Sequence, residues 1–208
     1  MRIQTPLEEK LNAFSHGLGA VLGVVALILL VQFNSEKSDW SLFSVVVYSV
    51  SIIILFSAST CYHATKNEKR KHYFRIVDHV SIYLLIAGTY TPVCLIALQD
   101  SLGWPLFYTV WGIALLGAVL KLFFTGRFEV VSTLLYLVMG WLIVFDISNL
   151  SEQIGSDGMW FMAAGGSAYS IGIIFYAIQK IRYNHVIWHL FVLTGAICHF
   201  LMIFLYVI

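Results

Sequence analysis

The chain has 208 residues, of which 60% are hydrophobic and 11% are charged, and its formal net charge at pH 7 is +1. Soluble globular proteins carry about 25% charged residues, so this chain has too few to cover a soluble surface. The composition therefore excludes a soluble globular protein and indicates an integral membrane protein. Because no basic tract is interleaved with aromatic residues, no nucleic-acid partner is expected.

Seven stretches without Asp, Glu, Lys or Arg follow one another along the chain. Most are close to the roughly 20 apolar residues that a helix needs to cross a bilayer, and their apolar character is continuous, unlike that of membrane β-strands. The fifth stretch is short but can continue past Asp146. The connections are also short, so residues 1–208 are predicted to form a single all-α transmembrane domain of seven helices. The stretches are residues 17–33, 40–64, 79–99, 102–120, 130–145, 158–179 and 185–208.

The positive charges fall almost entirely on one side of the predicted bundle. Of the twelve Lys and Arg residues, only Lys37 lies in a connection on the opposite side. Because cytoplasmic loops are enriched in Lys and Arg, the N-terminus is predicted to be cytoplasmic, and an odd number of helices then puts the C-terminus outside. The other eleven are Arg2, Lys10, Lys66, Lys69, Arg70, Lys71, Arg75, Lys121, Arg127, Lys180 and Arg182.

With this orientation, polar residues of four predicted helices fall in one layer near the cytoplasmic face. Ionisable residues at membrane depth are costly and usually functional, so this layer is the best candidate for a site. Its members are His16 in the first helix, Ser59 and His63 in the second, Asp78 and His79 in the third, and His185 and His189 in the seventh.

His185 and His189 are four residues apart, which puts both imidazoles on one face of a helix. Such a pair can bind one metal ion, although a proton relay or an interhelical hydrogen-bonding pair would have the same spacing. His63 can complete a set of three histidines, the arrangement of a catalytic zinc site with an open fourth position. A bound metal would supply a hydroxide nucleophile. Asp78 is then expected to orient that water or to act as general base, and Ser59 to hydrogen-bond to Asp78 or to a bound water.

Three other polar residues are interpreted as structural. His79 adjoins Asp78 but points elsewhere on the helix, so a packing or interface role is expected. His199 lies ten residues beyond His189, about 15 Å deeper on a helix, and is expected to be a buried hydrogen-bonding histidine. Asp146 is expected at the outer interface.

The segment before the first apolar stretch has a polar face of its own. Glu9, Asn12 and His16 recur at spacings of three and four, and Ser15 adjoins them. Two interpretations remain open: this face caps the histidine site from below, or it is an ordinary interfacial amphipathic segment.

These motifs together resemble those of the haemolysin III proteins, the bacterial branch of the progestin and adipoQ receptor superfamily. The resemblance covers almost the whole chain, in order, with the same helix count and orientation. The motifs are Glu9-x-x-Asn-x-x-Ser-His16, Ser59-x-x-x-His63, Asp78, the Ala-Gly-Thr-Tyr-Thr-Pro run at residues 87–92, and His185-x-x-x-His189 followed by His199.

The resemblance implies a chemistry for the site. In the adiponectin receptors of this superfamily, one histidine of the S-x-x-x-H motif and two of the H-x-x-x-H motif bind zinc, which implies that His63, His185 and His189 bind Zn²⁺ here. Asp78 and Ser59 match the aspartate and serine of the same motifs. The implied function is a zinc-dependent hydrolase, similar to ceramidases, that acts on an amide or ester of a membrane lipid in the bacterial inner membrane.

Two other functions remain open. The protein can instead be a non-enzymatic sensor or regulator of membrane state, in which a structural zinc ties the second and seventh helices together. The haemolysin name implies a pore, but the buried polar residues cluster at one face and do not line a path across the bilayer.

Overall fold

The computed structural model describes residues 4–208, and all regular secondary structure in that range is helical. This confirms the predicted all-α fold class. The long helices are α1 (Pro6–Gln32), α2 (Ser41–Ala64), α3 (Glu68–Pro92), α4 (Gly103–Phe124), α5 (Glu129–Trp141), α6 (Ile147–Ala177) and α7 (Asn184–Met202). Three short helical segments extend or join them: η1 (Val93–Ala97), η2 (Leu142–Asp146) and η3 (Ile203–Val207).

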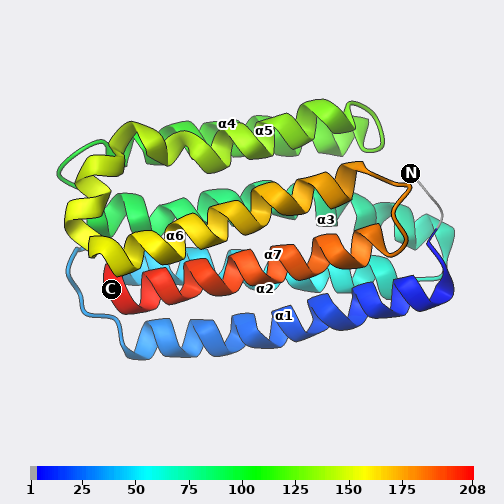
Figure 1. Ribbon diagram of the computed structural model, residues 1–208, viewed down its shortest axis with the longest axis horizontal. Helices are drawn as coiled ribbons and strands as arrows, with labels where there is room; N and C mark the ends of the chain where they lie inside the picture. The colour runs from blue at the N-terminus through cyan, green and yellow to red at the C-terminus, as the bar shows by residue number, and fades with distance from the viewer. Residues whose placement is uncertain (1–3) are drawn as a thin grey trace.

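Within the described range, six continuous helical segments are long and apolar enough to cross a membrane. One of the six, Glu129–Ala177, contains α5, η2 and α6 without a break. Figure 1 shows that α5 and α6 nevertheless run in opposite directions, so the chain reverses within this segment. Gly155, with φ 66° and ψ −177°, interrupts the helical conformation near this reversal, and glycine adopts positive φ at little cost.

The polar residues 151–157, which separate the fifth and sixth apolar stretches, therefore belong to helix α6 apart from the kink at Gly155. Two other helices begin earlier than the apolar stretches suggested. α1 begins at Pro6 behind a capping box formed by Thr5 and Glu8, and α3 begins at Glu68 behind the side-chain cap of Asn67. These polar first turns extend the two helices toward the N-terminal side of the apolar stretches. Glu9 and Asp78 therefore lie on regular helix.

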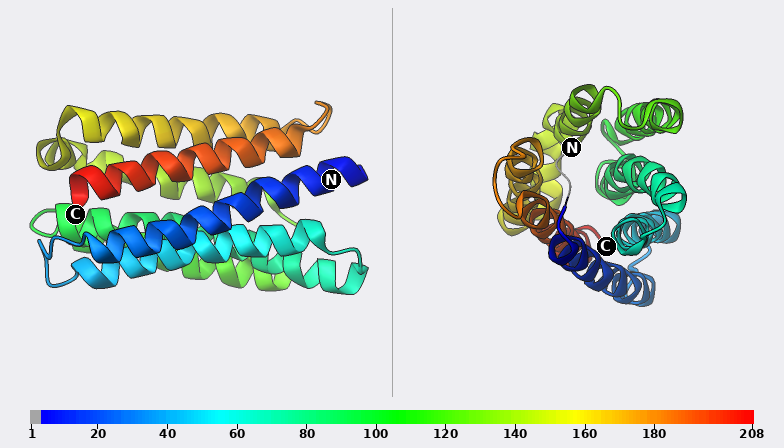
Figure 2. Two further views of the ribbon diagram at one scale, coloured as in Figure 1. Left: turned by 90° about the horizontal axis from the view of Figure 1, so that it is seen from below. Right: turned by 90° about the vertical axis from the view of Figure 1, so that its right-hand side faces the viewer.

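The seven long helices of the described chain follow one another around the bundle, and α7 closes it against α1. The end-on view in Figure 2 shows this arrangement, with α1 and α7 neighbours although they lie at opposite ends of the sequence. This closure brings the first turns of α1, the last turn of α2 and the first turns of α7 to one end of the bundle.

The outer surface of the bundle is strongly apolar. Phe123, Phe145 and Trp160 each expose more than 70% of their surface. The largest fully buried side chains instead include Tyr48, Phe56 and several leucines. A contiguous apolar exterior of this kind is unfavourable in water and is expected for helices that face lipid.

Candidate metal centre

His63 lies in the last turn of α2 and is 5% exposed. Its Nδ1 atom is 2.6 Å from Oε2 of Glu9 in the first turns of α1. A carboxylate can only accept a hydrogen bond, so Nδ1 of His63 is the protonated donor when the imidazole is neutral. Its Nε2 atom is buried, has no hydrogen-bond partner, and carries the free lone pair. A buried nitrogen with an unused lone pair is suited to bind a metal ion.

His189 presents its imidazole in the same way from α7. Its Nδ1 atom is 3.3 Å from the backbone carbonyl oxygen of Asn12, which can only accept. Nδ1 of His189 therefore donates to that carbonyl, which leaves Nε2 unprotonated in the neutral imidazole. His185 lies one turn earlier on α7, with its ring centroid 4.6 Å from that of His189.

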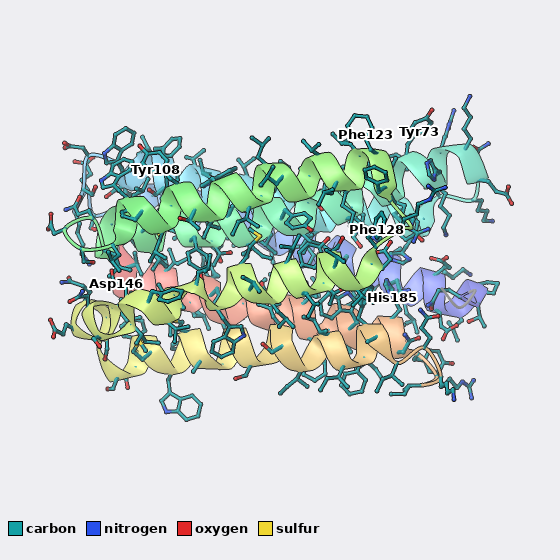
Figure 3. All side chains as sticks on the ribbon, turned by 90° about the horizontal axis from the view of Figure 1, so that it is seen from above. Tyr73, Tyr108, Phe123, Phe128, Asp146 and His185 are labelled. Atoms are coloured by element: carbon teal, nitrogen blue, oxygen red, sulfur yellow. The ribbon has the colours of Figure 1, made fainter. Side chains whose placement is uncertain are left out.

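The structure brings the three predicted metal ligands together. One ligand atom from each of His63, His185 and His189 lies within 4.8 Å of the other two. Figure 3 shows His185 at the end of the bundle that also holds Tyr73 and Phe128, while Asp146 lies at the opposite end. Three imidazoles, two of them held with Nε2 unprotonated, form a donor set that fits zinc and other imidazole-binding divalent metals.

Asp78 and Ser59 lie next to this cluster. Asp78 is in α3 and Ser59 is in α2, one turn before His63, and the two side chains adjoin one another. Both face a cavity of about 310 Å³ that His185 and His189 also line. A carboxyl group is thus placed beside the histidine cluster and the cavity, as a general base would need to be.

The cavity continues from the histidines into the apolar part of the bundle. Its wall there is formed mainly by hydrophobic side chains of α3, α5, α6 and α7, including Leu85, Ile86, Met159 and Val192. The arrangement joins a polar end, which can hold a metal and a carboxylate, to an apolar chamber that can hold a hydrocarbon chain.

His16, which the sequence placed in the same polar layer, lies against the histidine cluster. Its ring stacks on that of His189 with centroids 3.5 Å apart and an interplanar angle of 7°, and it meets Phe56 edge to face. His16 is 3% exposed and also lines the cavity. The polar face of residues 9–16 is therefore helical and turned toward the histidine cluster.

A second group of charges was not singled out in the sequence. Glu129, the first residue of α5, accepts hydrogen bonds from Lys121 at 2.8 Å and from Arg75 at 3.4 Å. His79 is buried, with its Nδ1 atom 3.8 Å from Glu129, and its backbone carbonyl accepts a hydrogen bond from Tyr136. This group joins α3, α4 and α5 beside the cavity. Its only signal in the sequence was that the fourth apolar stretch ends at the charged residue Lys121.

Two further polar residues lie away from the cluster. Asp146, expected at an interface, is 4% exposed and accepts hydrogen bonds from the Ser101 hydroxyl and the Leu102 backbone N–H, so it caps the start of α4. His199 contacts the ring of Tyr169 deep in the bundle and lines the cavity there.

The fold and this cluster define a class: an all-helical, multi-pass membrane protein with a buried histidine group at one end of an apolar cavity. Comparison with known proteins specifies the family. Residues 4–200 match the family model described as Haemolysin-III related, and the chain belongs to the haemolysin III family.

Relatives of the chain match it over nearly its whole length. It is 44% identical over 202 residues to Hemolysin-3 of Bacillus cereus, covering 97% of this chain and 92% of that protein. It is 42% identical over 200 residues to the Hemolysin-3 homolog of Bacillus subtilis (strain 168), covering 96% and 94%. The human Monocyte to macrophage differentiation factor is 27% identical over 208 residues, covering 97% and 85%. The family resemblance predicted from the motifs is confirmed.

Proposed function

We propose that this protein is a zinc-dependent hydrolase that cleaves an amide or ester bond of a membrane lipid. The observation that carries the proposal is the placement of His63, His185 and His189 beside Asp78, at the polar end of an apolar cavity. A lipid substrate would place its hydrocarbon chain among the apolar side chains and its scissile carbonyl near the histidines.

The roles of the residues follow from their chemistry. His63, His185 and His189 would hold the metal, and a zinc ion bound there would polarise the carbonyl and lower the pKa of a bound water toward about 7. Asp78 would accept the proton of the attacking water and return it to the leaving amine or alkoxide, which balances the hydrolysis. Ser59, next to Asp78, would hold that carboxylate in position.

The proposal includes seven membrane spans in a single domain of residues 1–208, with the N-terminus in the cytoplasm, in the bacterial inner membrane. The reversal between α5 and α6 supports counting Glu129–Ala177 as two crossings. The excess of Lys and Arg at the histidine end of the bundle supports a cytoplasmic site.

A second function has its own supporting observation. The three histidines come from α2 and α7, so a bound metal would link helices that are remote in sequence. A protein that senses or regulates membrane state would use the metal as such a link, without turnover. A pore, which the names of the bacterial relatives suggest for those proteins, is less favoured, because the cavity walls are mainly apolar.

The test is lipid turnover by the purified full-length protein, with zinc present, after zinc removal by a chelator, and after zinc is restored. Release of free fatty acid from an N-acyl or ester lipid, lost on chelation and regained with zinc, supports the hydrolase. Zinc binding without release of any fatty acid supports the regulator. Leakage of protein-containing vesicles under the same conditions would support the pore.

A further inference from the structure

The first turns of α1 contact two of the three candidate metal ligands: the Glu9 carboxylate lies 2.6 Å from Nδ1 of His63, and the Asn12 carbonyl accepts a hydrogen bond from His189. We propose that Glu9 is a positioning residue of the metal centre, which orients His63 and raises its affinity for the metal. This inference rests on the proposed metal site, but it concerns a residue outside the ligand set.

The two carboxylate oxygens of Glu9 have different partners. Oε2 is 2.6 Å from Nδ1 of His63, and Oε1 accepts a hydrogen bond from Nζ of Lys71 in α3, also at 2.6 Å. The Lys71 ammonium holds the carboxylate at the histidine and favours its charged form. Glu9 thus connects three helices, and its side chain is only 23% exposed.

The contact has a direct consequence for metal binding. With Nδ1 donating to a carboxylate, His63 is fixed in the tautomer whose Nε2 lone pair is available to a metal ion. The negative charge also increases the basicity of Nε2. Carboxylates placed in this way behind a ligating histidine are common in metal sites, and their loss typically weakens metal affinity by about 10–100-fold.

The position of Glu9 is fixed by the packing of α1 itself. The Asn12 carbonyl, one turn further along, accepts from His189, and Glu8 accepts from the backbone N–H of Tyr183, just before α7. Helix α1 is therefore docked on α7 as well as on α2. An ordinary surface ion pair between Glu9 and Lys71 would not need this docking and would contribute little to stability.

The experiment compares zinc affinity and thermal stability for the full-length protein in detergent. The variants are Glu9→Gln, Lys71→Gln and a matched control, Glu68→Gln, which makes the same chemical change at an exposed position near the same end of the bundle. Zinc affinity is measured by competition with a chelating dye, and the unfolding midpoint is measured with and without zinc.

Glu9→Gln is expected to weaken zinc binding by about 10–100-fold. Lys71→Gln should weaken it less, and Glu68→Gln should stay within about twofold of wild type, as an exposed surface change does. The zinc-free midpoint of Glu9→Gln should remain near that of wild type, whereas its zinc-induced rise should shrink. Cobalt(II) spectra of wild type and Glu9→Gln should also differ, because the orientation of His63 changes.

Wild-type zinc affinity in Glu9→Gln would overturn the inference. So would a lower zinc-free midpoint combined with an unchanged zinc-induced rise, because that pattern indicates a purely structural ion pair. If wild type itself binds no zinc, the proposed metal site fails, and this outcome is distinct from a failure of the role assigned to Glu9.

Discussion

Lys121, near the end of α4, donates a hydrogen bond from Nζ to Oε2 of Glu129, the first residue of α5, over 2.8 Å. The Lys121 side chain is 1% exposed and that of Glu129 is 27% exposed. The pair therefore links the end of α4 to the start of α5, and its positive charge is almost fully buried. Only Ser132 and Met139 of α5 are buried, and this ion pair adds to the hydrogen bond from Tyr136 to the His79 carbonyl in holding α5 to its neighbours.

Glu129→Ala is expected to destabilise the protein more than Lys121→Met does. The first change leaves a buried ammonium without its partner, at a cost of about 3 kcal/mol, the lower end of the range for a broken buried pair because Glu129 is partly exposed. The second change removes the buried charge itself. Thermal unfolding in detergent measures the order, with the exposed Glu68→Ala as control. A larger loss in Lys121→Met than in Glu129→Ala would contradict this account of the pair.

Zinc should stabilise the folded protein, and His63→Ala should abolish the effect. A ligand that binds only the folded state at 100 times its Kd adds about 2.7 kcal/mol to the free energy of unfolding. Wild type should therefore show a higher unfolding midpoint with zinc than with a chelator, and His63→Ala should show equal midpoints. The same zinc-induced rise in both proteins would place the binding site elsewhere.

Asp78→Asn is expected to separate metal binding from turnover. The amide keeps the size of the side chain but cannot accept a proton, so the hydrolysis rate should fall by about 10²–10⁴-fold while the zinc content stays at the wild-type level. Ser59→Ala should lower the rate less. Wild-type turnover in Asp78→Asn would remove this residue from the role of general base.

Two glycines of α4 give a matched test of helix packing. A Cβ atom at Gly117 would overlap the buried ring of Tyr83 on α3, whereas nothing lies within 4 Å of a Cβ at Gly112. Gly117→Ala should destabilise the protein by about 1–3 kcal/mol, and Gly112→Ala should not. Equal unfolding midpoints for the two variants would show that α3 and α4 are not in this close contact.

The proposed orientation predicts which loops react with a membrane-impermeant thiol reagent. The native cysteines Cys61, Cys94 and Cys198 are first replaced in every variant. A single cysteine introduced at Ser35 or Asp157 should then be labelled from outside the cell. A single cysteine at Lys69 or Arg182 should be labelled only after the membrane is opened. Labelling of Asp157→Cys only from inside would mean that α5 and α6 do not form two crossings.

The sequence predicted the histidine cluster because two independent features converge on it. The His185 and His189 spacing sets one helix face, and the ends of the apolar stretches set the depth of His63 and Asp78. The contact of Glu9 with His63 was not predictable in this way, because it depends on the orientation of α1 about its own axis relative to α2. The hydrophobic periodicity of the sequence does not determine that orientation.

The other differences between the structure expected from the sequence and the observed structure have similar causes. Residues 151–154 include Ser151, Glu152 and Gln153, a polar composition that suggests a loop between two helices, yet they are helical and belong to α6. Lys121 was interpreted only as one of the charges that orient the bundle. Its burial depends on the turn that brings Glu129 back toward it, and residue types alone do not specify that turn.

The central claim is that His63, His185 and His189 bind one metal ion. Anomalous scattering measured at the zinc absorption edge, on crystals of the zinc-treated protein, tests it directly. The account predicts one strong peak among the three imidazoles, in contact with their nitrogen atoms, and its loss in a His185→Ala/His189→Ala variant. A wild-type map without a peak among these imidazoles, or a peak that persists in the double variant, would contradict the claim.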